Sequence, residues 1–331
     1  MASRCSARAF VRHSWSERRC RRPAGPRRPA DGWPGLTSSR LSAMRAASAD
    51  GRVLRLAAPP APLPVRLGAP TGPSAKATRR AALALGRHGY CVCQCAFGTA
   101  AIAAAASEAI ALYRKKRMAP GGFVVGGAPV QGRGQARGGN RDDHVLWLHE
   151  YLVAVGGPER GEARTLCDVD AIVSSFAQAV VEALSELPQA DAPLGRAADG
   201  SPLYYTGRTD SMVACYPGGG AAYGPHIDNA DGDGREAEDY GRCFTAVLYL
   251  NSRWDESQGG GALRIYLPPE SAPAHDARHA VEVYPHGDTL VIFRADRIVH
   301  EVCPAFQARL ALTVWMYAGN EEQGRKMRPS A

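Results

Sequence analysis

The chain has 331 residues, of which 45% are hydrophobic and 22% are charged, so it can bury one large core or two smaller ones. The formal net charge of +8 belongs to residues 1–50, where eleven Arg oppose Glu17, Asp31 and Asp50, and the remaining residues sum to zero. A neutral body lacks the basic surface that binds a phosphate backbone, and no apolar run approaches the roughly 20 residues of a membrane helix, so we expect neither a nucleic-acid partner nor a membrane span.

Residues 1–77 contain Pro-rich stretches, such as Ala58-Pro-Pro-Ala-Pro-Leu-Pro64, and no sustained hydrophobic periodicity. This composition predicts a disordered basic and Pro-rich head. Its start is rich in Arg and Ser and poor in acidic residues, which resembles an organellar transit peptide as much as a plain disordered tail. A plain tail favours a cytoplasmic or nuclear location and a transit peptide an organelle, and the sequence leaves open whether the head is cleaved.

Three segments downstream of the head have helical patterns. Residues 78–85 and 99–117 are Ala-rich, and the basic cluster Arg114-Lys-Lys-Arg117 suits the C-terminal end of the second helix. Residues 170–187 have the clearest pattern, with apolar side chains at every fourth position. Asp168 or Asp170 is the candidate N-cap, because a carboxylate can accept from the free N–H groups of a first helical turn.

Two segments between these helices need their own interpretation. Cys91, Cys93 and Cys95 alternate with other residues, which predicts a strand with its thiols on one face, since a zinc site would need C-x2-C pairs. Residues 121–139 hold eight glycines in nineteen residues. A loop of this kind is a mobile linker or an active-site lid, and we favour the lid.

From Met212 onward, the hydrophobic pattern changes to the period of two that is typical of strands. Residues 244–250 alternate, residues 263–267 continue the pattern, residues 289–293 form a short apolar run, and residues 309–317 alternate again. Several short strands broken by Gly, Pro, Asn and Asp indicate a β-sandwich or jelly roll. Because helices precede the strands, we expect a mainly β fold with supporting helices against one face.

An H-x-D pair, His226 and Asp228, lies in Tyr223-Gly-Pro-His-Ile-Asp-Asn229, and His300 follows the apolar run further along. Two imidazoles and one carboxylate are the ligands of the facial triad, which holds non-haem Fe(II) and leaves positions open for an oxidant and a co-substrate. The pair alone is also compatible with a surface turn, because loop-forming residues follow it at once. The sequence therefore predicts an iron site only in combination with His300 and its surroundings.

Arg309 opens an otherwise apolar strand nine residues after His300. A guanidinium on one strand face with Thr313 and Trp315 is costly unless it meets an anion, and its planar fork suits a carboxylate. Tyr249, on the inward side of its own strand, could donate to the same anion. Metal ligands, this Arg and this phenol together predict a dicarboxylate co-substrate that chelates the iron at one end.

Several motifs recur in the order typical of one enzyme family. They resemble the hypoxia-inducible-factor prolyl hydroxylases, which belong to the 2-oxoglutarate and Fe(II)-dependent dioxygenases. The resemblance covers roughly residues 78–318 and leaves a short tail at residues 319–331. Its motifs are Arg141-Asp-Asp-His-Val-Leu-Trp147, Met212-Val-Ala-Cys-Tyr-Pro-Gly218, His226-Ile-Asp-Asn229, Asp231-Gly-Asp-Gly-Arg235, Tyr249-Leu-Asn251, Gly260-Gly-Ala-Leu-Arg-Ile265, His300-Glu-Val302 and Arg309-Leu-Ala-Leu-Thr-Val-Trp315.

The resemblance implies a distorted double-stranded β-helix and peptidyl-proline 4-hydroxylation of the oxygen-sensing type. It implies Fe(II) bound by His226, Asp228 and His300, 2-oxoglutarate and O2 as co-substrates, ascorbate to keep the iron reduced, and a proline-containing protein or peptide as substrate. Arg309 and Tyr249 would hold the distal carboxylate of 2-oxoglutarate. The further implied contacts are Met212, Tyr216, Val247, Leu263, Val302 and Thr313 around 2-oxoglutarate, and Tyr223, Arg235 and Trp315 toward the substrate.

Two departures from the family pattern bear on the substrate. Residues 236–241 are an insert, and the segment between Leu267 and Thr289 is longer and richer in Pro and His. Its histidines, His275, His279 and His286, are predicted to be solvated. Both segments are expected to lie at the entrance of the active site. The peptide specificity of the family is therefore the property that this chain is least expected to share.

Two other functions stay open at this point. One is a related oxygenase that acts on a different protein, such as a ribosomal protein, a ubiquitin-ligase adaptor or a Pro-rich structural polypeptide. The other is a non-catalytic binding module with the same fold. The sequence gives no indication of the oligomeric state.

Overall fold

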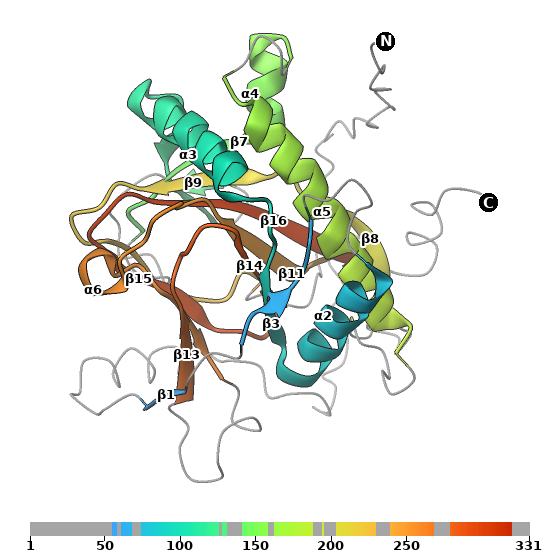
Figure 1. The fold of residues 1–331 in the computed structure, drawn as a ribbon. Helices are drawn as coiled ribbons and strands as arrows, with labels where there is room; N and C mark the ends of the chain where they lie inside the picture. The colour runs from blue at the N-terminus through green and yellow to red at the C-terminus, as the bar shows by residue number, and fades with distance from the viewer. Residues whose placement is uncertain are drawn as a thin grey trace, which may run out of the picture.

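A jelly roll of two facing sheets forms the body of the protein, and helices pack against the outer side of the larger sheet (Figure 1). The computed structural model describes residues 55–57, 61–67, 74–125, 128–130, 141–157, 162–187, 194, 203–229, 239–267 and 279–319. The predicted mainly β fold with helices on one face is therefore confirmed.

The larger sheet has nine strands in the order β2-β3-β14-β11-β16-β9-β7-β4, with β8 also paired to β16. Its long strands β11 and β16 are antiparallel, with Thr245 opposite Trp315 and Val247 opposite Thr313. This pairing places the predicted co-substrate residues of two distant segments side by side. The strands are β2 Leu63–Pro64, β3 Tyr90–Gln94, β4 Ala119–Pro120, β7 His144–Trp147, β8 Tyr204–Arg208, β9 Met212–Tyr216, β11 Asp239–Tyr249, β14 Thr289–Arg294 and β16 Arg309–Gly319.

The smaller sheet has five strands in the order β1-β13-β12-β15-β10. Strands β10 and β15 are antiparallel, and His226 lies opposite His300 in their register. The two histidines of the predicted triad are therefore neighbours across one sheet. The strands are β1 Arg55–Ala57, β10 Ala221–His226, β12 Leu263–Tyr266, β13 His279–Val283 and β15 His300–Ala305, and a separate hairpin joins β5 Phe123–Val125 to β6 Ala128–Val130.

The period of two in β11 divides its side chains between two cores. Phe244, Ala246 and Leu248 enter the core beneath the helices, whereas Val247 and Tyr249 point into the space between the sheets. Since a strand alternates its side chains between its two faces, β11 contributes side chains both to the core under the helices and to the core between the sheets. The predicted alternation is confirmed.

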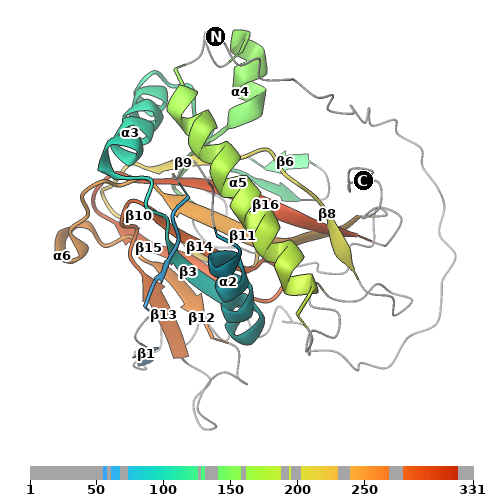
Figure 2. The ribbon, with the colours of Figure 1, turned by 45° about the vertical axis from the view of Figure 1, so that its right-hand side comes forward.

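Three long helices cover the outer side of the larger sheet, as the second view also shows (Figure 2). They are α2 (Ala75–His88), α3 (Thr99–Arg114) and α5 (Arg164–Ser185), which confirms the three predicted helices with shifted ends. Two short helices, α4 (Leu148–Val155) and α6 (Glu256–Gly259), lie in connections. Among the described residues, no helix is long and apolar enough to cross a membrane.

The N-terminal end of α5 differs from its prediction. The helix starts at Arg164, and its cap residue makes no side-chain hydrogen bond. Instead, the Glu108 carboxylate of α3 accepts from the backbone N–H groups of Thr165 (2.9 Å) and Leu166 (2.8 Å). The predicted caps at Asp168 and Asp170 are wrong, because the group that satisfies these donors belongs to another helix.

The structure also differs from the predicted disordered head at its C-terminal end. Val65 and Leu67 are almost fully buried, and their backbone N–H groups donate to Gln94 and Cys95 at 2.8 Å. Helix α2 starts before residue 78, at Ala75, with the Ser74 side chain as its cap. Pairing with a strand later in the chain fixes this segment, which its local composition could not indicate. Residues 1–54 lie outside the described residues.

The three alternating cysteines form part of the core. Cys91 and Cys93 lie in β3 and Cys95 follows it, all three buried and facing the helices. Their thiols are free, and within the described ranges none joins a cluster that could hold a metal. The predicted buried strand is confirmed. Of the glycine-rich segment, residues 126–127 and 131–139 lie outside the described residues, so its role as a lid stays a prediction.

Candidate active site

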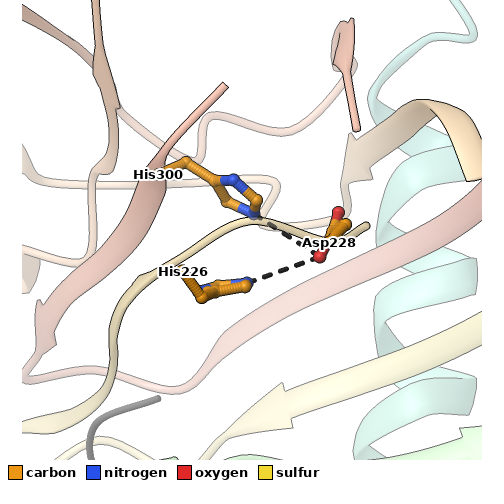
Figure 3. A group of neighbouring side chains, drawn as sticks. All are labelled: His226, Asp228 and His300. Carbon is orange, nitrogen blue, oxygen red and sulfur yellow. Dashed lines mark ion pairs between the residues drawn. The ribbon is translucent and has the colours of Figure 1, made fainter. Parts of the chain in front are cut away.

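The three predicted metal ligands meet at one point between the sheets (Figure 3). The Nε2 atoms of His226 and His300 lie 3.4 Å and 3.7 Å from the same oxygen, Oδ1 of Asp228. One ligand atom from each residue lies within 4.8 Å of the other two, and within the described ranges no other group of this kind occurs. The predicted convergence of two imidazoles and a carboxylate is present.

Backbone carbonyls fix how the two imidazoles face the centre. His226 Nδ1 lies 2.9 Å from the carbonyl oxygen of Gly224, and His300 Nδ1 lies 3.1 Å from that of Ile298. A carbonyl oxygen only accepts, so Nδ1 carries the proton of each neutral ring, and the nitrogen with the lone pair is then Nε2, which faces the centre. This is the arrangement that metal-binding histidines use.

Asp228 is held by donors on one oxygen only. Its Oδ2 accepts from Thr245 Oγ1 (2.6 Å) and from Trp315 Nε1 (3.0 Å), which leaves Oδ1 toward the histidines. Burial by itself raises the pKa of Asp228, but His300, His226 and Thr245 hold the pKa of this carboxyl well below its usual range. The side chain is therefore an anion with one oxygen available for a cation.

The pKa of His300 and the aromatic contacts of both histidines agree with a metal-binding role. Burial and the neighbouring His226 lower the pKa of His300 to about 4, so its ring is neutral at physiological pH. The Tyr223 ring stacks on His226 with the centroids 3.7 Å apart, and Phe293 lies 4.5 Å from the His300 ring. Two imidazoles and one carboxylate form the donor set that non-haem Fe(II) prefers.

A buried cation also lies between the two sheets. Arg309 is only 2% exposed, and its Nε donates to the carbonyl oxygen of Gly261 at 2.9 Å. Its guanidinium carbon lies 5.0 Å from the ring centroids of Tyr216 and Tyr249. Among the described residues, no carboxylate pairs with Arg309.

The Tyr249 hydroxyl lacks a hydrogen-bond partner within the described ranges, although it is buried. Burial raises the pKa of Tyr249 while Arg309 lowers it, and the net rise keeps the phenol protonated as a donor. Among the described residues, a buried cation without a carboxylate partner and a buried hydroxyl without a hydrogen-bond partner are each costly alone. Both fit the carboxylate of a ligand that also reaches the metal centre.

Comparison with known proteins agrees with this geometry. Residues 211–317 match the family described as the 2OG-Fe(II) oxygenase superfamily. These residues form a 2OG-Fe(II) oxygenase domain. The matched segment contains all three triad residues together with Tyr249 and Arg309.

The oxygenase domain is homologous to prolyl hydroxylases over its catalytic region. Egl nine homolog 1 of Rattus norvegicus is 42% identical over 123 residues, which is 37% of this chain and 32% of the rat protein. The hypoxia-inducible factor prolyl hydroxylase of Caenorhabditis elegans is 30% identical over 188 residues, 56% of this chain and 21% of that protein. The matched region therefore spans about a third or less of each relative's length.

A solved structure extends the likeness to the fold. It is a Trichoplax adhaerens prolyl hydroxylase in complex with a peptide fragment of the hypoxia-inducible factor oxygen degradation domain. The TM-score is 0.53 at 26% identity, over 77% of this chain and 96% of that chain. The two facing sheets are therefore the distorted double-stranded β-helix of this enzyme group.

The oxygenase domain brings the predicted co-substrate residues together. Val247 and Leu263 lie in the inner core with Tyr249, and Met212, Tyr216 and Val302 lie in the adjoining core. Thr313 is buried opposite both Val247 and Met212 in the sheet register. The residues predicted toward the substrate, Tyr223 and Trp315, contact His226 and Asp228, and Arg235 lies outside the described residues.

Two histidines of the long insert, His279 and His286, are not part of the group that could hold a metal. His286 is half-exposed, and its Nε2 lies 2.8 Å from Glu256 Oε1, so its predicted exposure to solvent is confirmed. His279 begins β13 and is partly buried, which corrects its prediction, because pairing with β12 withdraws it from the insert. His275 lies outside the described residues.

Three residues around the ligands were not foreseen. Arg141 forms a bidentate pair with the buried Asp143 (2.6 and 3.0 Å) and lies over the Tyr223 ring. Thr245 donates to Asp228. The alternation of residues 244–250 already placed Thr245 on the inward face, so that signal was available. The contact between Arg141 and the Tyr223 ring depends on tertiary packing, so the sequence around Arg141 could not indicate it.

Proposed function

We propose that this protein hydroxylates C4 of a proline in a protein substrate. One atom of O2 enters the C4–H bond as a hydroxyl group, and the other enters 2-oxoglutarate, which loses CO2 and becomes succinate. The observation that carries the proposal is that the space between the sheets holds a His226–Asp228–His300 triad together with a buried Arg309 and a buried Tyr249, and among the described residues the arginine has no carboxylate partner and the phenol no hydrogen-bond partner. The prolyl hydroxylase relatives support proline as the target.

In this proposal, His226, Asp228 and His300 hold ferrous iron, which when bound supplies the activation of O2. Arg309 and Tyr249 bind the distal carboxylate of 2-oxoglutarate, since a guanidinium and a phenol give it charge-assisted hydrogen bonds. Within the described part of the chain, the Tyr249 hydroxyl has no other acceptor to leave when the ligand enters, and Arg309 can keep its bond to Gly261 through Nε while its other N–H groups bind the ligand. The dry pocket lined by Met212, Tyr216, Val247, Leu263, Val302 and Thr313 then excludes water from the reacting atoms.

The substrate side of the site is aromatic. Tyr223 and Trp315 contact the iron ligands, and Trp147 lies 5.9 Å from Trp315 between ring centroids. Flat aromatic faces suit the apolar ring of a proline. Arg235 remains a proposed contact to the substrate.

The remaining assignments belong to the same proposal. Ascorbate keeps the iron reduced, and the reaction serves oxygen sensing in the cytoplasm or nucleus, or in an organelle if the head is a transit peptide. The oxygenase unit extends over about residues 78–318, and the segment of residues 61–67 that pairs with β3 precedes it. Neither nucleic acid nor a membrane is a partner.

A panel of synthetic peptides tests the target directly. The full chain with Fe(II), 2-oxoglutarate and ascorbate is offered proline peptides from transcription factors, ribosomal proteins, ubiquitin-ligase adaptors and Pro-rich structural proteins. We expect one class to gain the mass of one oxygen atom at proline, with an equal amount of succinate. Succinate formation with oxidation at another residue would favour the related-oxygenase alternative, and a lack of succinate with every peptide would favour a binding module.

A further inference from the structure

Arg242, just after the insert of residues 236–241, lies against the metal centre without touching it. Its guanidinium carbon lies 4.2 Å from the ring centroid of Trp315. The Nε1 atom of that indole donates to Oδ2 of Asp228 at 3.0 Å. A continuous line of contacts therefore runs from a cation through an aromatic ring to an iron ligand.

The backbone places Arg242 with several constraints. Gly241 has φ +77, and a side chain there would approach Asn229 Nδ2 to 2.9 Å, so glycine is needed on both counts. The Asn229 side chain donates to the carbonyl oxygen of Arg242 at 2.9 Å. The pairing of β11 with β16 shifts register on both sides of Arg242. Register irregularities of this kind re-aim a side chain, often next to an active site.

The stacked cation acts on the hydrogen bond of the indole. A positive charge over an indole face is attracted to the ring by about 0.5–2 kcal/mol, and it draws electron density from the N–H group. Trp315 is thereby held in one orientation as a stronger donor to Oδ2. With Oδ2 engaged, Oδ1 is the oxygen that faces His226 and His300.

We propose that Arg242 is a positioning residue of the iron site, which acts through Trp315 to fix the Asp228 carboxylate. The proposal rests on the iron binding in the proposed function, and it assigns a role to the end of the insert. In this role, the charge of Arg242 strengthens the hydrogen bond from the Trp315 indole to Asp228, and the size of the Arg242 side chain does not matter.

Mn(II) titration of the full chain, with free Mn(II) followed by electron paramagnetic resonance, tests this without turnover. Partners that orient metal ligands change metal affinity by about 10–100-fold, and Arg242 acts one contact further out, so Arg242→Met should weaken Mn(II) binding about three- to tenfold. Arg242→Lys keeps the cation and should restore most of the affinity. Arg253→Met, which removes an exposed arginine, is the matched control and should bind like the unaltered protein.

A double-variant cycle separates positioning from a general structural effect. Trp315→Phe removes the N–H donor, so adding Arg242→Met to it should cost little more. Equal binding by Arg242→Met and the unaltered protein, a loss in Arg242→Lys as large as in Arg242→Met, or a full additional loss in the double variant would overturn the proposal. If the unaltered protein bound no Mn(II), the proposed function itself would fail, which is a distinguishable result.

Discussion

The carbonyl oxygens of Gly224 and Ile298 select the tautomers of the two imidazoles, and the donors on Oδ2 orient the carboxylate. The geometry of the proposed iron site therefore depends on groups beyond the three ligand side chains. The ligand side chains supply the donor atoms, while the backbone carbonyls, Thr245 and Trp315 fix the orientation of these side chains. Arg309 is likewise oriented by a backbone group, because its Nε donates to the Gly261 carbonyl oxygen.

Substitution of Arg309 tests the anion pocket at the residue scale. Charged hydrogen bonds contribute about 1.5–3 kcal/mol, so Arg309→Ala should raise the apparent KM for 2-oxoglutarate about ten- to hundredfold. The KM for the peptide should change little. Succinate formation measured against 2-oxoglutarate concentration checks this, with Arg253→Ala as the control. An unchanged requirement for 2-oxoglutarate would remove Arg309 from the pocket.

At the scale of elements, the inter-strand pairing creates the site. His226 ends β10 opposite His300 at the start of β15, and Arg309 starts β16 opposite Tyr216 at the end of β9. Strand β15 starts at His300 and ends at Ala305, shortly before Arg309, so the metal ligands and the anion-binding candidates lie toward opposite ends of β10 and β15 in the space between the sheets. The long helices pack against the outer face of the larger sheet and form one core with it.

The helical layer has a tertiary cap that stability measurements can detect. Glu108→Ala removes the acceptor for the N–H groups of Thr165 and Leu166, and loss of a cap costs about 0.5–2 kcal/mol. Thermal or denaturant unfolding should show this loss. Glu186→Ala, at the exposed other end of α5, should stay within about 0.5 kcal/mol of the unaltered protein. Equal effects of the two changes would contradict the capping role.

The sequence predicted the strand alternation, the convergence of the three triad side chains and the burial of Arg309, because hydrophobic period, donor type and charge can be recognised in short stretches of sequence. It did not predict the cap of α5, since Glu108 belongs to another helix. It also missed Arg141 and Arg242, whose partners are aromatic rings brought near only by folding. Local patterns therefore give the donors of this site, and the supports around them need the tertiary structure.

At the scale of the whole molecule, the folded part of the chain includes residues that its composition assigns to a disordered head. The segment of residues 61–67 lies parallel to β3, and Val65 and Leu67 enter the outer core. Residues 74–77 add the cap and first turn of α2. This N-terminal extension closes the edge of the larger sheet, which otherwise would end at β3.

Two truncations test where the folded unit starts. A chain beginning at residue 61 keeps the extension, whereas one beginning at residue 78 loses Leu67, whose removal from a core costs about 2–5 kcal/mol for the side chain alone. The shorter chain should unfold at a clearly lower temperature. Circular dichroism melting of both chains, beside the full chain, checks this. Equal melting temperatures for both truncations would show that residues 61–77 contribute no stability.

The most direct test of the iron and 2-oxoglutarate site is anaerobic absorption spectroscopy of the full chain with both ligands. A ferrous ion chelated by a 2-oxo acid absorbs in the visible range by charge transfer, so the band reports both ligands at one centre. We predict that the unaltered protein and His286→Ala show the band, that His226→Ala loses it, and that Arg309→Ala needs more 2-oxoglutarate to reach it. A band of equal strength in His226→Ala, or none in the unaltered protein, would contradict the assignment.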